Sequence, residues 1–506
     1  MVYKISLTKK IIGISMCVIA FGAILMMALQ TGTSDIWYDE VFSVAFAKMS
    51  VTDLVHMTAL DVHPPLYYLY LKFFTMAGMT LFGEGAYITL CKIASVLPWF
   101  FIALISITLI RRKWNIFVTG LFLMLVTMMP QIGNYYVEIR MYSFALLLIT
   151  LCGLAAIYIY ASESKGKRIW WCVLFVTGIM TAYTQYYACI GIAGIYIGLL
   201  LALLISKKEG IKKDILRLLF CIILSIITYI PWIPVVYRQF SNISGNYWIQ
   251  PLTIRSIAGC VKFIFLPVCD KTLLSYLTVG GMLLVCAFVI IMSIIYNRKT
   301  TVLYLCIFIM PLLLVVLSGF VLSAMGTPIF VYRYMIPVLG LFWLYIALCI
   351  DKITDKGWMI ILLVIPFLMA GILVCRGFYL EEHKKVEHMP LVENAFDLIP
   401  QDAAIVCNFD HVAAISGYYL KSNDIYLYEG EIDPILYKIF DGCGECANTD
   451  TICSLLLNGK DVYFFGSFNS REDIIKEWAE EGIEASEQDS VLLERYWFNI
   501  YRLDRK

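Results

Sequence analysis

The sequence predicts a polytopic α-helical membrane protein of about eleven spans, followed by a small C-terminal α/β domain. Its mean hydropathy is +0.80, and 61% of its 506 residues are hydrophobic while only 15% are charged. Soluble globular proteins do not have this composition. Residues 377–506 hold 25 of the 38 acidic and 11 of the 39 basic residues, a net charge of −14, whereas residues 1–376 have +15. This break predicts a membrane domain over 1–376 and a soluble domain over 377–506.

The first span follows a short basic segment and covers about residues 11–30. No small-x-small cleavage site precedes Asp35, so we expect a retained signal anchor rather than a cleaved signal peptide. The other apolar stretches that are long enough to span the bilayer lie near 90–110, 115–131, 142–160, 169–187, 188–206, 216–235, 274–296, 301–322, 334–350 and 357–375.

Basic residues lie on one side of this predicted topology. Eighteen of the 28 bases in residues 1–376 fall at the N-terminus or in the even-numbered connections, Arg111-Arg112-Lys113 among them. By the positive-inside rule the N-terminus is cytoplasmic. An odd number of spans then places residues 377–506 outside, as the extracytoplasmic domain of a multi-pass protein of the cell membrane.

The C-terminal domain has the mixed pattern of an α/β fold. Helices are expected near 381–399 and 471–482, and strands at 404–407 and 461–465. Cys443, Cys446 and Cys453 could form a disulfide or a soft-metal site if this domain lies outside. No motif in it suggests catalysis, and an accessory role is expected.

The first outer loop, residues 31–88, holds six of the acidic residues, and loops of this length are often functional. Asp39 and Glu40 follow Trp37-Tyr38 directly after the first span. A carboxylate there can act as a general base or bind a metal. The alternative is a hydrated interfacial pair beside an ordinary aromatic belt.

A second group in this loop is Asp61-Val62-His63-Pro64-Pro65, which leads into an aromatic segment expected along the membrane surface. An Asp/His pair held by two prolines suits a site for a partly lipid substrate. The alternative is an interfacial helix started by proline and capped by His63.

Two arginines stand at the outer mouths of spans, where a guanidinium needs an anionic partner. Arg140 has Glu138 two residues away, so an ion pair between them is one reading. Arg333 has no acidic residue nearby in the sequence, which favours a phosphate ligand. Aromatic and polar residues of other outer connections are further candidates: Tyr183, Gln185, Tyr186 and Trp248.

Taken in order, these motifs resemble those of GT-C glycosyltransferases. They are Trp37-Tyr38-Asp39-Glu40, Asp61-x-His63-Pro64-Pro65-Leu66-Tyr67-Tyr68, Glu138-x-Arg140-Met141-Tyr142, Pro231-Trp232-x-Pro234 and Arg333-Tyr334. The resemblance covers residues 1–376 and is greatest to bacterial relatives of protein O-mannosyltransferases and of the lipid A aminoarabinose transferase. One departure is Gln185, where many relatives have histidine in Tyr-Thr-His-Tyr.

The resemblance implies a GT-C fold and transfer of a monosaccharide, with inversion, from a polyprenyl-phosphate donor to an acceptor hydroxyl outside the membrane. Asp39 would be the general base, and Arg333 and Arg140 would bind the donor phosphate. Glu40, Asp61 and His63 would position the acceptor or, with Asp39, hold a divalent cation. Glu138, Tyr183, Gln185, Tyr186 and Trp248 would position substrate.

The sequence leaves the sugar and the acceptor open: a glycan, lipid, cell-wall polymer or protein would each serve. Membrane lipid is an expected partner and nucleic acid is not. The alternative functions are a transporter or flippase of lipid-linked sugars and a non-catalytic envelope scaffold. A transporter would need charged groups near mid-membrane and repeat symmetry, and neither is evident.

Overall fold

The computed structural model describes the chain apart from residues 1–4, 33–35, 162–165, 207–209, 244–248, 268–271, 354, 431–433, 440–442 and 494. The chain divides into two compact units. Residues 1–31 and 58–379 form the first, here called the membrane unit. Residues 32–57 and 380–506 form the second, the tail unit. The start of the expected outer loop therefore belongs with the C-terminal residues.

Every predicted apolar stretch is helical. Among the described residues eight helices are long and apolar enough to span a membrane, and a pair bent by 46° at residue 309 makes a ninth. The helices at the remaining two stretches have only 12 and 16 residues. The expected polytopic fold is confirmed, and the protein is a multi-pass membrane protein.

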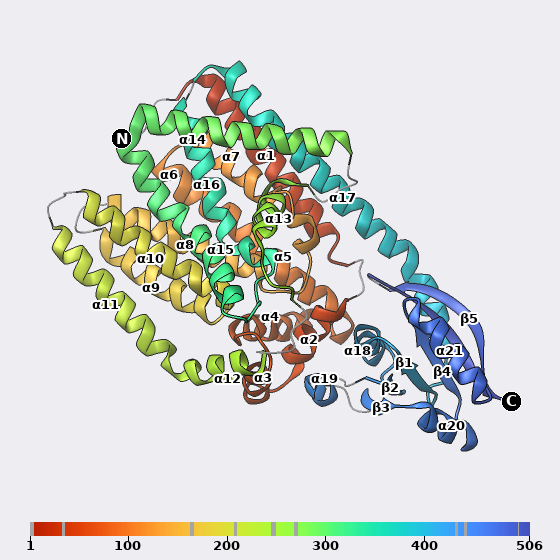
Figure 1. Ribbon diagram of the computed structural model, residues 1–506. Coiled ribbons are helices and arrows are strands. Elements are labelled where there is room, and N and C mark those ends of the chain that lie inside the picture. Colours follow the sequence, from red (N-terminus) through yellow and green to blue (C-terminus); the bar gives the residue numbers. More distant parts are fainter. Residues whose placement is uncertain are drawn as a thin grey trace. The chain divides into compact units, whose positions relative to one another are not determined.

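The membrane unit contains the following long helices: α1 (Leu7–Leu29), α4 (Leu66–Phe82), α5 (Tyr87–Ile105), α7 (Ile116–Thr127), α8 (Tyr142–Ala161), α9 (Lys167–Ala182), α10 (Tyr186–Ser206), α11 (Ile211–Tyr229), α12 (Ile233–Ile243), α13 (Ile254–Phe265), α14 (Leu273–Phe308), α15 (Met310–Ala324) and α16 (Ile336–Ile353). Helix α17 (Gly357–Asp397) begins in this unit, and α3 (Val51–Leu60) ends in it. Helix α16 is almost wholly buried, because α7, α8 and α14 pack around it (Figure 1).

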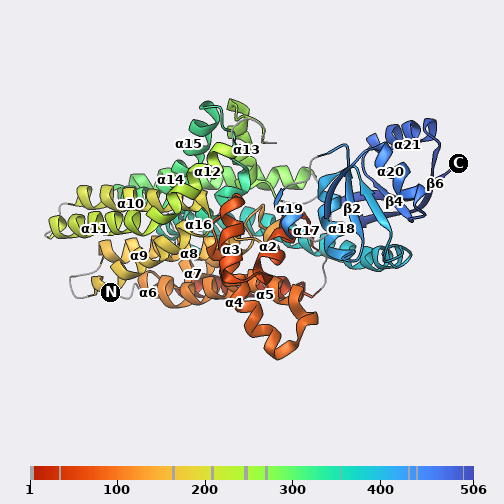
Figure 2. The same cartoon turned by 90° about the horizontal axis from the view of Figure 1, so that it is seen from below.

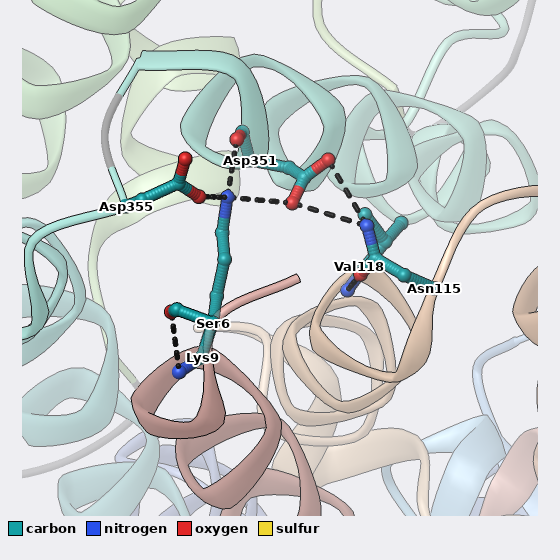
Figure 3. A network of polar contacts seen from close by, with 6 residues as sticks. All are labelled: Ser6, Lys9, Asn115, Val118, Asp351 and Asp355. Atoms are coloured by element: carbon teal, nitrogen blue, oxygen red, sulfur yellow. Dashed lines mark hydrogen bonds and ion pairs between the residues drawn. The ribbon is translucent and has the colours of Figure 1, made fainter. Parts of the chain in front are cut away.

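A polar network joins three helices at one end of this unit. Lys9 of α1 is only 2% exposed, and its Nζ lies 3.0 Å from an Asp351 carboxylate oxygen and 2.9 Å from one of Asp355. Figure 3 shows Asn115, at the start of α7, donating to the same Asp351 carboxylate at 3.2 Å. The N-terminus and two connections that the charge pattern places on one side of the membrane thus meet, as that topology requires.

The tail unit contains a six-stranded sheet of order β3-β2-β1-β4-β6-β5. The strands are β1 (Ala404–Cys407), β2 (Asp424–Tyr428), β3 (Cys443–Ala447), β4 (Val462–Gly466), β5 (Ile483–Leu493) and β6 (Tyr496–Arg505). Strands β3, β2, β1 and β4 are parallel to one another, β6 pairs antiparallel with β4, and β5 pairs antiparallel with β6. The expected strands at 404–407 and 461–465 are therefore confirmed as β1 and β4.

Helices cover both faces of this sheet (Figure 2). On one face, Trp478 of α21 (Ser470–Glu480) packs on Phe464, and Ile452 of α20 (Thr449–Leu457) joins the same core. On the other, Phe396 at the end of α17 stacks on Phe465. Successive β4 side chains point to opposite faces, so both faces are buried and the expected α/β domain is confirmed.

The remaining helices of the tail unit are α2 (Tyr38–Lys48), α18 (Asp410–Tyr419) and α19 (Pro434–Ile439), and both α18 and α19 contact α2. Of the three cysteines singled out by spacing, Cys446 and Cys453 are free thiols. The side chain of Cys443 lies outside the described part of the chain.

Candidate functional site

A cavity of about 340 Å³ lies within the membrane unit. Its wall is formed by residues of α10, α11, α12 and α15 and of the segments before α4, before α10 and after α15. Most of these side chains are apolar or aromatic. The lining residues are Val62, His63, Gln185, Tyr186, Tyr187, Cys189, Ile190, Tyr229, Val236, Gln239, Phe240, Leu322, Ile329 and Tyr334. Apolar walls with a few convergent polar groups are typical of ligand sites.

The turn between α9 and α10 supplies Gln185, one of the polar lining residues. The backbone N–H of Gln185 donates to Thr181 O at 3.2 Å, and Cys189 N–H donates to Gln185 O at 3.0 Å, so Gln185 sits between the two helices. The N–H of Leu66, just after the two prolines, donates to Tyr183 O at 3.0 Å. A backbone hydrogen bond therefore links the predicted proline motif to the Tyr183–Tyr186 motif.

A chain of hydrogen bonds fixes Tyr186. Trp232 Nε1 donates to its hydroxyl at 3.1 Å, and the hydroxyl in turn donates to Gln239 Oε1. Gln239 Nε2 donates to Thr58 O at 3.0 Å. Gln239 thus orients Tyr186 and holds the end of α3, a role that no sequence motif indicated.

His63 and Arg140 form a buried pair at the cavity wall. The two side chains belong to residues 8% and 5% exposed, and Arg140 Nη2 lies 2.8 Å from His63 Nε2. Burial lowers the pKa of His63 well below its ordinary value, and the positive charges of Arg140 and Arg333 lower it further. The imidazole is therefore neutral, accepts through Nε2 and carries its proton on Nδ1.

Arg140 and Arg333, which are 193 positions apart, both lie close enough to His63 to lower its pKa. Arg333 lies half-buried in a short 3₁₀ turn, Tyr332–Met335, directly before α16. Its neighbour Tyr334 stacks on Tyr187 with ring centroids 4.9 Å apart, and both rings line the cavity. Glu138 is 6% exposed, and its carbonyl accepts from Arg140 N–H at 2.7 Å.

Two cavity-lining groups have unmet hydrogen-bonding capacity. Gln185 is 2% exposed, and within the described part of the chain neither its Oε1 nor its Nε2 has a hydrogen-bond partner; the same holds for the Tyr187 hydroxyl. A buried polar group without a partner costs about 1–3 kcal/mol. Because both residues line the cavity, these groups are available to hydrogen-bond a polar ligand.

The other predicted residues are distributed as follows. Asp61 is half-buried in the turn between α3 and α4. Asp39 and Glu40 belong to the tail unit, in the first turn of α2. Glu40 is 2% exposed and its Oε2 accepts from Trp37 N–H at 3.0 Å, so it caps its own helix. Trp248 lies outside the described residues.

The candidate metal ligands are divided between the two units, with Asp39 and Glu40 in the tail unit and Asp61 and His63 in the membrane unit. Over the ranges that the structure describes, no three His, Cys, Asp or Glu side chains could together hold a metal ion. His63 Nε2 already faces Arg140, and one Glu40 oxygen is bonded to the backbone. Glu40 and His63 are therefore already engaged by other groups of the chain.

No protein-family model matches the chain, and no curated protein matches it either. Solved structures do. ArnT from Cupriavidus metallidurans bound to undecaprenyl phosphate is similar with a TM-score of 0.60 and 12% identity, covering 97% of both chains. The apo form gives 0.59 and 12%, covering 96% of this chain and 97% of that one. This likeness is one of fold, and it confirms the expected GT-C fold.

Proposed function

We propose that the protein is a membrane glycosyltransferase that moves a monosaccharide from a polyprenyl-phosphate donor to an acceptor hydroxyl, with inversion. The observation that carries this proposal is the buried contact between Arg140 and the neutral His63, which lines a cavity that is otherwise mostly apolar and aromatic. Arg333 lies close enough to lower the pKa of the same imidazole. A lipid-linked sugar phosphate has the matching chemistry: an anion, a polar sugar and a hydrocarbon chain. The ArnT structure of the same fold was solved with undecaprenyl phosphate.

The two guanidinium groups are proposed to bind the donor phosphate. They would stabilise the negative charge that grows on the phosphate oxygen as its bond to the anomeric carbon breaks. The neutral imidazole of His63 holds Arg140 in place without cancelling its charge. Gln185 and the hydroxyl of Tyr187 would bind sugar hydroxyls, and the apolar wall would receive the first prenyl units.

Asp39 is proposed as the general base. Its carboxylate would take the proton of the acceptor hydroxyl while that oxygen attacks the anomeric carbon, and polyprenyl phosphate would leave from the opposite face. Glu40, Asp61, Glu138, Tyr183 and Tyr186 remain candidates for holding the substrates. The proposed orientation has a cytoplasmic N-terminus and the tail unit outside, as the basic residues favour.

The decisive experiment uses purified full-length protein and a panel of radiolabelled undecaprenyl-phosphate sugars, with thin-layer chromatography to detect label transfer or donor hydrolysis. We expect one donor to release undecaprenyl phosphate. Asp39→Asn should lower the rate by ~10²-fold or more, the usual contribution of a general base, while donor binding persists. Asp53→Asn, at an exposed position bonded to Ser50, is the matched control and should stay active.

Two results would refute parts of this proposal. Near-normal turnover of Asp39→Asn would remove that residue as the base. A wild-type protein that moves labelled lipid between the leaflets of proteoliposomes, with no sugar released from any donor, would instead establish a transporter of lipid-linked sugars.

A further inference from the structure

The carboxyl edge of the tail-unit sheet has the topology of a binding crevice. Strands β1 and β4 are parallel neighbours. From β1 the chain continues to β2 on one side and then to β3, and it returns to form β4 on the opposite side of β1. Open α/β sheets bind ligands at the carboxyl ends of the strands where the order reverses in this way. Here that point lies after Cys407 and Gly466.

The residues that follow β1 and β4 contact one another at this edge of the sheet. Asn408, after β1, and Ser467, after β4, are joined by two backbone-to-amide hydrogen bonds of 2.8 Å each. Beside them Phe409 packs on Phe468 and on Tyr496, with ring centroids 5.0 and 5.6 Å apart. His411 Nδ1 lies 2.9 Å from the Tyr496 hydroxyl. The result is a rigid aromatic edge with an imidazole in it.

The segment that binds this edge is the chain's own residues 36–38. The ring of Tyr38 stacks on His411 with centroids 3.8 Å apart and planes 24° apart. Ile36 N–H donates to the Tyr419 hydroxyl at 3.3 Å, and the Arg495 guanidinium lies 4.0 Å from the centroid of the Trp37 ring. Three contacts from α18 and the β5–β6 turn therefore fix the three residues directly before Asp39 and Glu40.

These contacts matter because α2 has only 11 residues, and a helix this short is marginally stable without packing. Asp39 lies in its first turn and is close enough to act on the imidazole: burial lowers the pKa of His411, while Asp410 and Asp39 partly oppose that shift. The three residues that lead into Asp39 of α2 therefore contact side chains more than 370 positions later in the sequence.

We propose that the C-terminal domain holds the catalytic segment in position, and that His411, stacked on Tyr38, is the positioning residue for Asp39. This inference rests on the proposed role of Asp39 as the base. His411 touches no reacting atom in this account. It acts by limiting the movement of α2. The carboxyl edge of the sheet, where other open α/β sheets bind a ligand, here binds the chain's own catalytic segment.

The test compares four full-length variants: His411→Ala, His411→Phe, Tyr38→Ala and, as a matched control, His388→Ala, a histidine of the same unit whose ring packs against Trp497. Hydrogen exchange of residues 36–48 reports positioning without reference to activity. Turnover with the donor identified above reports catalysis. We expect His411→Ala and Tyr38→Ala to expose 36–48 to faster exchange and to lower kcat by ~10–100-fold, the cost of misplacing a reacting group, with an unchanged KM for the donor.

The control should match the wild type in both measurements, and His411→Phe should recover most of the protection and the rate because a phenyl ring can stack on Tyr38. The double variant Tyr38→Ala, His411→Ala should be no slower than either single variant, since both remove one contact. Faster exchange at 36–48 with unchanged kcat would overturn the inference, as would unchanged exchange in His411→Ala or a His411→Phe variant no better than His411→Ala. A wild-type protein that transfers no sugar would instead overturn the proposed function, and with it the catalytic part of this inference.

Discussion

Buried polar groups lie near both ends of α16, but their hydrogen-bond partners differ in charge. At its C-terminal end Lys9 meets two carboxylates, and Asn115 donates to one of them (Figure 3). Before its N-terminal end, ~27 Å away for 18 residues at 1.5 Å each, Arg140 donates to a neutral imidazole. There, within the described residues, the Gln185 amide has no hydrogen-bond partner.

This difference separates polar groups that hold helices together from polar groups that are ready for a ligand. The Lys9 network balances a buried cation with carboxylates from the chain itself, which leaves no role for an outside anion. Beside the cavity, Arg140 donates to a neutral imidazole, and Arg333 lies close enough to lower the pKa of that imidazole. Each of the following variants tests one side of this comparison.

The largest effect is expected on donor binding. Arg333→Ala and Arg140→Ala should each weaken binding of undecaprenyl phosphate by ~10- to 150-fold, because hydrogen bonds to charged groups contribute about 1.5–3 kcal/mol. Isothermal titration calorimetry in detergent measures this affinity. Arg238→Ala, on the exposed side of α12, is the control and should bind normally. An unchanged affinity of Arg333→Ala would refute the phosphate assignment.

Lys9→Ala should instead act on stability. It leaves the Asp351 carboxylate, which is 18% exposed, without its cation, and breaking a partly buried pair of this kind costs roughly 2–3 kcal/mol. Thermal unfolding followed by tryptophan fluorescence should show a lower Tm, while Lys10→Ala, at an exposed neighbour, should not. If Lys9→Ala reduced donor affinity in the folded protein, the separation of the two ends would be wrong.

Two amide-to-leucine substitutions should shift stability in opposite directions. Gln185→Leu removes a buried amide that has no hydrogen-bond partner among the described residues, so the free energy of unfolding should rise by about 1 kcal/mol while donor turnover falls. Asn115→Leu removes the bond to Asp351 and the cap of α7, so stability should fall by about 1 kcal/mol with turnover per folded molecule unchanged. A Gln185→Leu protein that is both less stable and fully active would contradict the cavity assignment.

The smallest expected effect is on the pH dependence of stability. The pKa of His63 is lowered in the folded protein, so the unfolded chain takes up a proton below about 6.5 while the folded protein does not. Stability is therefore retained above pH 6.5 and lost as the pH falls toward the folded pKa. Between pH 7.5 and 6.0 this loss amounts to about 0.8 kcal/mol for one site. His63→Gln should flatten that part of the pH profile of the Tm, and an unaltered slope would show that His63 is not the titrating group.

Some of the site was accessible from the sequence because its residues lie in compact local motifs. His63 follows directly on a turn and precedes two prolines, and Tyr183, Gln185 and Tyr186 share one turn between helices. Tyr334 belongs to the Arg333-Tyr334 motif and Tyr187 follows Tyr186, but neither was predicted as a site residue. Gln239 had no signal, because its role depends on Thr58 and Tyr186 lying within reach, 181 and 53 positions away.

The sequence by itself determined the apolar spans, the clustering of basic residues in alternate connections and the change to an acidic α/β domain. Each of these follows from local composition and from periodicities that a helix or strand imposes on its own residues. Only the tertiary structure decided that Arg140 contacts His63, and that residues 36–38 pack on the aromatic edge of a sheet that begins at residue 404. Such pairings depend on how distant helices and strands pack, and no local pattern of residues encodes them.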